Sequence, residues 1–212
     1  MTNQIPKILH TTWVGGEMPT DVRVWLDTWK QRHPSWEFML WDNDAVFSRK
    51  WRNQKHIDHY RALGDWAGVA DIVRIETLFE YGGANFGADS ECFEAIDELF
   101  VEQQADAFLS YENEKVRGGL LTPLLACTKQ NDFAFVLMSV LMLKEKLGQP
   151  WLSTGNTFTT ALAQALEYPR LKIWPSHYFL PVHYTGERYE GGGKVYGTHH
   201  WGSHGAYKQP TV

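Results

Sequence analysis

Cysteine and long apolar runs are both scarce in this sequence of 212 residues. It has only two cysteines, Cys92 and Cys127, so no disulfide framework is implied and a reducing, cytoplasmic setting is expected. No apolar run approaches the roughly 20 residues that a membrane-spanning helix needs. The first residues, MTNQIPKILHTTW, lack the basic and apolar regions of a secretory signal. We therefore expect no membrane span.

An excess of positive charge and several common catalytic motifs are also missing. The formal net charge is −5, which gives no electrostatic reason to expect nucleic acid as the main partner. The sequence has no GxxxxGK[ST] loop and no GxGxxG after a predicted strand, so P-loop and dinucleotide-binding functions have no support. GxSxG and HExxH motifs are absent too.

Aromatic residues are abundant instead. The chain is 43% hydrophobic and contains 10 Trp and 9 His. Most of the tryptophans are expected in the core, but Trp and His also suit a site that stacks rings and binds metals. The length allows one well-buried domain, and repeats and linker-like tracts are absent, so residues 1–212 are predicted to form a single domain.

Strand and helix patterns alternate along the chain. In the first half, strands are expected at 7–14 and 36–41, and helices at 20–33, 45–63 and 65–81. In the second half, helices are expected at 93–104, at 133–147 and after a polar loop at 153–156. A strand is expected at 107–111, and strands or extended segments at 171–174, 178–183 and 194–201. The alternation predicts an α/β fold with a parallel sheet, which binds ligands at the carboxyl ends of its strands.

Several residues near those strand ends could bind a ligand. Trp13, Asp42 and Asp89 each fall close to the end of a predicted strand. Trp13 is either a core residue or a platform on which a base stacks. Asp71 and Arg74 lie three apart on a predicted helix and share one face, so they form either a surface ion pair or a pair directed at sugar hydroxyls.

The metal candidates are the acids of LFEYGGANFGADSECF and the histidines of GTHHWGSHG. Asp89 and Glu91 with one imidazole would suit Mn²⁺ or Mg²⁺ better than zinc. His199 and His200 are adjacent, so in an extended segment at most one of them faces a given site. His204 is a third candidate. The structural alternative for each is a turn aspartate or a hydrogen-bonded surface histidine.

Three stretches, in this order, resemble a known family. IPKILHTTWVGGEMP, WKQRHPSWEFMLWD and AGVADIVRIETLFEYGGANFGADSEC resemble the DXD-containing glycosyltransferases of family 32, which includes the yeast initiating α-1,6-mannosyltransferase and bacterial capsular-polysaccharide transferases. STGN at 153–156 stands where the family has a TGP motif. HHWGSH at 199–204 matches the family's closing HHWxxSW.

The resemblance implies a GT-A fold in which residues 1–100 form a nucleotide-sugar-binding half. Residues 101–212 would form the acceptor side and a C-terminal metal-binding segment. Such enzymes transfer a hexosyl or pentosyl group from a UDP- or GDP-linked donor, usually with retention and with Mn²⁺ or Mg²⁺. The acceptor would be a glycan, a protein or a modified DNA base. The short chain without an anchor suits a bacterial or phage enzyme of the cytoplasm.

The resemblance also assigns roles to single residues. Trp13 would stack on the base, while Asp71 and Arg74 would position the sugar as catalytic residues together with Asp89. Asp89 would bind the metal with His199 or His200. The full set expected to contact the donor is His10, Trp13, Asp42, Asp71, Arg74, Asn85, Gly87 and Ser203.

This chain departs from the family pattern at the DXD motif itself. Gly87 replaces the first Asp, Asn85 replaces a Tyr and His204 replaces a Trp. Three outcomes are open: an active enzyme with a changed donor preference, which we favour, recruitment of Glu91 as a substitute acid, or a catalytically weak relative. Two other functions are alternatives: a nucleotide-sugar- or carbohydrate-binding module, and a metal-dependent phosphodiesterase.

Overall fold

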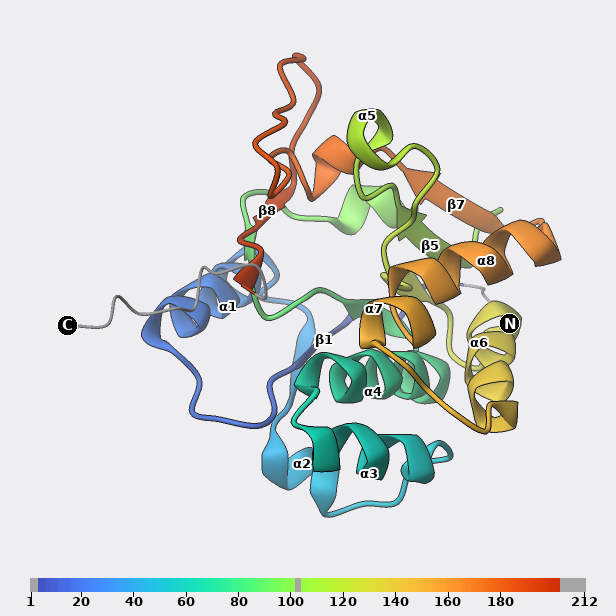
Figure 1. Cartoon of the computed structure of the whole chain (residues 1–212). Helices are drawn as coiled ribbons and strands as arrows, with labels where there is room; N and C mark the ends of the chain where they lie inside the picture. The colour runs from blue at the N-terminus through green and yellow to red at the C-terminus, as the bar shows by residue number, and fades with distance from the viewer. Residues whose placement is uncertain (1–3, 102–103, 203–212) are drawn as a thin grey trace.

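A six-stranded sheet forms the centre of the computed structural model, which describes residues 4–101 and 104–202. The strands are arranged in the order β2-β1-β3-β6-β5-β7 (Figure 1). Their bounds are β1 (Ile8–Thr12), β2 (Glu37–Trp41), β3 (Gly83–Asn85), β5 (Ala107–Ser110), β6 (Ala126–Cys127) and β7 (Leu171–Trp174). Strand β1 is parallel to β2 and β3, and β5 is parallel to β7, whereas β6 is antiparallel to both of its neighbours. The expected α/β fold is confirmed, with one antiparallel strand inside the sheet.

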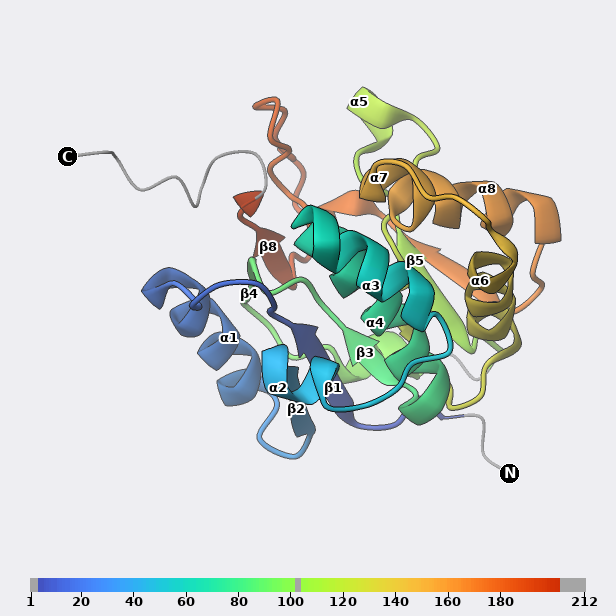
Figure 2. The ribbon, with the colours of Figure 1, turned by 60° about the horizontal axis from the view of Figure 1, so that its bottom comes forward.

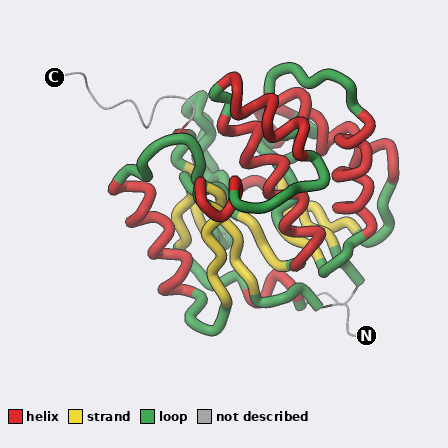
Figure 3. The backbone as a smooth tube through the Cα atoms, turned by 90° about the horizontal axis from the view of Figure 1, so that it is seen from below, coloured by secondary structure: helices red, strands yellow, loops and turns green. Residues whose placement is uncertain are grey.

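Helices cover this sheet, as the views in Figures 2 and 3 show. They are α1 (Thr20–Arg32), α2 (Asn43–Phe47), α3 (Gln54–Leu63), α4 (Trp66–Tyr81), α5 (Glu114–Arg117), α6 (Asp132–Leu143), α7 (Pro150–Ser153) and α8 (Asn156–Leu166). Because successive strand residues point to opposite faces, Phe108 and Leu109 of β5 enter two different apolar cores. Phe108 packs in the core that contains Trp29 of α1. Leu109 packs in the core that contains Ile72 of α4.

A second, two-stranded sheet lies beside the first. Strand β4 (Ser90–Cys92) pairs antiparallel with β8 (Gly197–His199), with Ser90 opposite His199. Helix α1 supports the pair, because Trp29 Nε1 donates to the Ser90 carbonyl at 3.1 Å and Thr28 Oγ1 accepts from the Cys92 amide. This small sheet brings the C-terminal part of the described chain to the residues that follow β3.

One predicted helix is wrong. Residues 93–104 were expected to be helical, but only a 3-10 helix, η1 (Asp97–Phe100), forms there. The amides of Phe93 and Glu94 donate to the Tyr196 carbonyl, and the Ile96 amide donates to His33 Nε2. These long-range bonds tie residues 93–96 to Tyr196 and His33 in a conformation that is not helical.

At 178–183, where a strand or an extended segment is expected, no strand forms. Pro181, which has no amide hydrogen for a sheet, lies within it. The segment instead follows a second 3-10 helix, η2 (Ser176–Tyr178), and the Leu180 amide donates to Ser176. Elsewhere, residues 48–53 divide the predicted helix 45–63 into α2 and α3. No helix in residues 4–101 or 104–202 is long and apolar enough to cross a membrane.

Candidate functional site

Four segments converge beside the middle of α4 (Trp66–Tyr81). They are the second and third turns of α4, the turn between β3 and β4, the end of β8, and the turn between α7 and α8. Each brings a polar side chain or a glycine to the same region.

Asp71 is held by the turn between α7 and α8. Thr154 Oγ1 donates to Asp71 Oδ2 at 2.9 Å. A Cβ atom on Gly155 would lie 3.0 Å from the same carboxylate oxygen, so a glycine there lets the backbone approach Asp71 closely. Burial raises the pKa of Asp71 to about 6, although Arg74 and Thr154 act in the opposite direction.

Arg74 lies one turn further along α4 and is withdrawn from water. Burial lowers the pKa of its guanidinium, while the charges of Asp71 and Asp89 raise it. Its Nε is buried, and within the described part of the chain it has no hydrogen-bond acceptor. A buried donor without a protein acceptor is costly, so this nitrogen is suited to an oxygen atom supplied by a ligand.

Asp89 is fixed by the last described residues of the chain. Its Oδ1 lies 3.1 Å from His199 Nε2, and its Oδ2 accepts from the Gly202 amide at 2.9 Å. Burial raises the pKa of Asp89, but the His199 imidazole and the Gly202 amide outweigh it and hold the pKa well below its usual range. Asp89 is therefore an ionised carboxylate that stands beside an imidazole.

His200 points elsewhere, as the alternation of an extended chain predicts. Its Nε2 lies 3.1 Å from Glu91 Oε2, and its ring stacks on Trp25 with centroids 3.8 Å apart. The structure therefore brings His199 to Asp89 and separates His200 from it.

Asp89 and His199 are the side chains of this site that suit a divalent ion. In residues 4–101 and 104–202 no group of three or more His, Cys, Asp or Glu side chains could hold a metal. Mg²⁺ and Mn²⁺ often bind through one or two carboxylates and complete their shell with substrate phosphates and water. The pair thus fits an ion that arrives with a diphosphate, and it does not form a closed protein cage.

Gly87 lies directly against this pair and has no side chain to contact it. A Cβ atom there would lie 2.8 Å from Asp89 Oδ1 and 3.5 Å from His199 Nε2. A carboxylate at position 87 would therefore face the one at position 89, as the two acids of a DXD motif are expected to do. The glycine removes a like charge from Asp89.

This geometry predicts that Gly87→Asp lowers the melting temperature in the absence of divalent ions. Two carboxylates in contact repel each other, and we expect a loss of about 1–2 kcal/mol. Added Mn²⁺ should restore stability more in this variant than in the wild type, because an ion that binds only the folded state stabilises it. Thermal unfolding with and without Mn²⁺ tests this, with Gly87→Asn as the uncharged control. Equal Mn²⁺ shifts in all three proteins would contradict it.

Trp13 borders the turn that contains Asp89. It follows β1 and packs, partly exposed, against the cluster of Val22, Leu26 and Ala88. Next to it, Gly15 has a φ of +102°, and a Cβ there would overlap the Trp66 ring at 2.5 Å. Trp13 thus lies against Ala88, the neighbour of Asp89 in the chain.

His10 and Asn85 lie under α4, inside the sheet. His10 is buried, with Nε2 2.9 Å from the Gly82 carbonyl and Nδ1 3.1 Å from Trp41 Nε1, so both ring nitrogens have protein partners. Asn85 is opposite His10 in the β1–β3 register and is 1% exposed. Its Nδ2, like Arg74 Nε, lacks an acceptor in the described residues.

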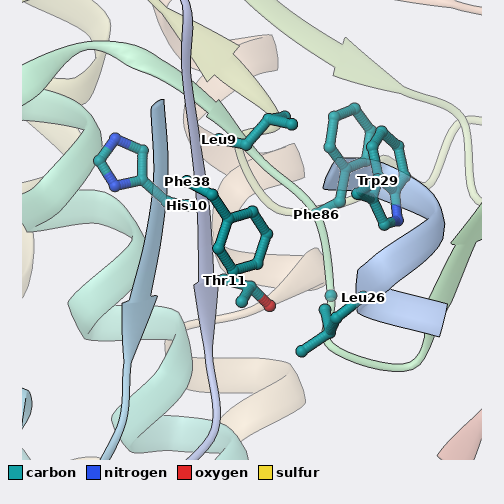
Figure 4. Close-up of a pocket in the computed structure, with 8 residues that line it drawn as sticks. Leu9, His10, Thr11, Leu26, Trp29, Phe38 and Phe86 are labelled. Carbon is teal, nitrogen blue, oxygen red and sulfur yellow. The ribbon is translucent and has the colours of Figure 1, made fainter. Parts of the chain in front are cut away.

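Figure 4 shows a small apolar cavity on the other face of the strands. It is lined by side chains that include Leu9, Phe38 and Phe86, while His10 points away from it. Its volume of about 10 Å³ is close to what one water molecule occupies, so it is not a site for a nucleotide.

Asp42 has a local structural role. It is the N-cap of α2, and its Oδ1 accepts from the Ala45 amide at 2.9 Å. We expect Asp42→Ala to lower the free energy of unfolding by about 1 kcal/mol and Asp42→Ser, which keeps a capping oxygen, to restore most of it. Urea unfolding measures both. A stable Asp42→Ser protein with weakened donor binding would show instead that the carboxylate contacts the donor.

Ser203 and His204, which the sequence also suggested, lie outside the described residues. Conversely, sequence reasoning did not assign Thr154 and Gly155 a role. The signal was present, because both belong to the STGN stretch that stands in place of a TGP motif.

The fold is shared with solved glycosyltransferases. The structure named PaToxG Glycosyltransferase superposes with a TM-score of 0.61, 15% identity, and coverage of 79% of this chain and 71% of that one. The UDP-bound glycosyltransferase domain of the YGT toxin gives a TM-score of 0.60 and 10% identity, covering 81% of this chain and 80% of that one. The predicted GT-A fold is confirmed. No family model matches the chain.

Sequence relatives are also glycosyltransferases. Inositol phosphoceramide mannosyltransferase 3 of Schizosaccharomyces pombe is 25% identical over 224 aligned residues, which cover 93% of this chain and 60% of the relative. Inositol phosphoceramide mannosyltransferase 2 of the same yeast is 29% identical over 98 residues, 45% of this chain and 28% of the relative. The chain thus has glycosyltransferase homologues and spans less than two thirds of the length of each.

Proposed function

We propose that this protein is a glycosyltransferase that transfers a sugar from a UDP- or GDP-linked donor to an acceptor hydroxyl with retention. The observation that carries the proposal is the pairing of Asp89 with His199 beside Arg74, whose Nε is buried. A carboxylate, an imidazole and a guanidinium whose Nε has no acceptor among residues 4–101 and 104–202 together suit a diphosphate and its counterion.

Different side chains contact the sugar, the phosphates and the base of the donor. Asp71 accepts hydrogen bonds from sugar hydroxyls and Arg74 donates to oxygen atoms between the sugar and the phosphates. Trp13 stacks on the base, and Asn85 contributes its Nδ2 as a further donor. We assign no nucleophile or general base, because the departing phosphate can take the proton of an acceptor that attacks from the same face.

Asp89 and His199 would hold Mn²⁺ or Mg²⁺. When bound, such an ion neutralises negative charge on the departing diphosphate. The protein holds these two side chains in place. The Gly202 amide fixes Asp89, and the pairing of β4 with β8 fixes His199.

The names of the relatives favour particular substrates. One solved neighbour is a UDP-bound domain, and two sequence relatives are named mannosyltransferases that act on inositol phosphoceramide. Mannose is therefore the first sugar to test, with UDP and GDP as competing carriers. A hydroxyl of an inositol or a glycan is the first acceptor. Cys92 and Cys127 are both free, which fits a reducing compartment such as the cytoplasm.

The test is incubation with a panel of UDP- and GDP-sugars and Mn²⁺. We expect release of the nucleoside diphosphate together with a free or transferred sugar. Tight binding without turnover would replace the proposal by a binding module. Release of a sugar phosphate and a nucleoside monophosphate would replace it by a phosphodiesterase.

A further inference from the structure

Two exposed aromatic rings flank one arginine at the border of the proposed donor site. Trp151 of α7 and Tyr184 are 43% and 36% exposed. Arg117 of α5 lies between them, with its Cζ 5.8 Å from the centroid of each ring. Its Nη2 donates to the Tyr184 hydroxyl. We call Arg117, Trp151 and Tyr184 the aromatic rim.

A buried carboxylate fixes the rim from below. Glu112 follows β5, and its side chain is 4% exposed. It forms an ion pair with Arg117 Nε at 3.5 Å, accepts from Asn156 Nδ2 at 2.5 Å and lies 3.2 Å from His183 Nε2. A buried charge is tolerated when several partners satisfy it, and such a network holds its members in one geometry. The arginine is therefore held in place between the rings.

The rim adjoins the donor site along two routes. On one side, Asn156 follows Gly155, the residue that lies against Asp71. On the other side, the Tyr184 ring contacts Trp201 at 5.2 Å, and Trp201 contacts His199 at 4.7 Å.

The arrangement of the chain agrees with this. Figures 1 and 2 show α5 and the segment after Tyr184 at the same end of the molecule, where Lys115 pairs with Glu187. The rim thus borders the place where an acceptor would meet the donor sugar.

The chemistry of the rim matches a polyhydroxylated ring. Aromatic faces cover the C–H face of such a ring, while Arg117 and Asn156 can bond its hydroxyls. Two acids lie near Arg117: Glu114 is in the same helix, and Glu187 pairs with Lys115 of that helix. The protein also carries a net charge of −5, so binding of a polyanion is disfavoured.

We propose that the aromatic rim is the acceptor subsite and binds an uncharged six-membered ring with several hydroxyls. Such a ring occurs in glycans and in the inositol part of lipid head groups. The inference rests on the proposed transfer reaction, for which it names the class of acceptor. Glu112 acts as a positioning residue through Arg117 and Asn156.

The test is saturation-transfer NMR with methyl α-mannoside and with myo-inositol on the whole protein. We expect binding of at least one ring to the wild type, and binding about tenfold weaker after Trp151→Ala. Phe135→Ala, which removes another ring that is 50% exposed, is the matched control and should bind like the wild type. The two probes distinguish a glycan from an inositol head group.

Equal binding to wild type and Trp151→Ala, no binding to either, or a preference for free nucleosides over both rings would overturn the inference. Binding of nucleotide sugars is measured separately on the wild type. Ring binding without any nucleotide-sugar binding would overturn the proposed transfer reaction and leave a carbohydrate-binding rim.

Discussion

Replacing Asp89 with asparagine is expected to lower donor turnover by about 1,000-fold or more, because the charge that faces the diphosphate and its ion is lost. Asparagine has nearly the same shape, and its oxygen can still accept from the Gly202 amide. The fold should therefore persist. The measurement is nucleoside diphosphate release from the donor with Mn²⁺, in wild type and variant.

Glu91→Gln is the matched control for Asp89→Asn. Glu91 is a neighbouring carboxylate that lies 3.1 Å from its own histidine, His200, as Asp89 lies 3.1 Å from His199. Its loss should change turnover by no more than about twofold, in the range of partly exposed pairs. Full activity in Asp89→Asn would refute the assignment, and a large loss of turnover in Glu91→Gln would then make Glu91 the functional acid.

Replacing Asp71 with asparagine should affect activity and stability in opposite directions. Donor turnover should fall about 10- to 100-fold, the value of a hydrogen bond to a charged group. Stability at pH 7 should rise by up to about 3 kcal/mol, because ionised Asp71 is unfavourable in its buried setting and asparagine removes that charge. Asp58→Asn, an exposed change on α3, should alter neither.

The stabilisation depends on pH in a defined direction. Since the pKa of Asp71 is raised from 3.8 to about 6, the folded protein holds a proton there that the unfolded chain releases near pH 4. Protonation therefore favours folding below pH 4, and this contribution is lost as the pH rises to 6. The stability difference between Asp71→Asn and wild type should be near zero at pH 4 and grow to its full value above pH 6. Urea unfolding at several pH values measures it, and a constant difference would contradict the prediction.

Local patterns sufficed for much of the fold. The apolar spacing and Gly82 marked α4 to within one residue, since α4 spans Trp66–Tyr81, and Pro34 marked the end of α1. Residues 93–104 show why other elements could not be predicted. Their helical pattern was overridden by bonds to Tyr196 and His33, which lie far away in the sequence.

The candidate site, like the fold, was predictable only in part from the sequence. The resemblance singled out Asp71, Arg74 and Asp89, and the structure brings all three together. The contact of Asp71 with Thr154 and the burial of Glu112 depend on how distant segments pack, which local spacing does not encode. The choice between His199 and His200 depended on strand register, because the pairing of Ser90 with His199 decides which imidazole faces Asp89.

The three-residue pairing of β4 with β8 makes the proposed donor site sensitive to shortening of the chain. The Gly202 amide donates a hydrogen bond to Asp89, although the two residues are 113 positions apart in the chain. A stop codon or a protease cut near residue 195 would spare strands β1–β3 and β5–β7 of the large sheet and helices α1–α8. It would nevertheless remove the partners of Asp89. Truncated forms of this protein should therefore lack donor turnover.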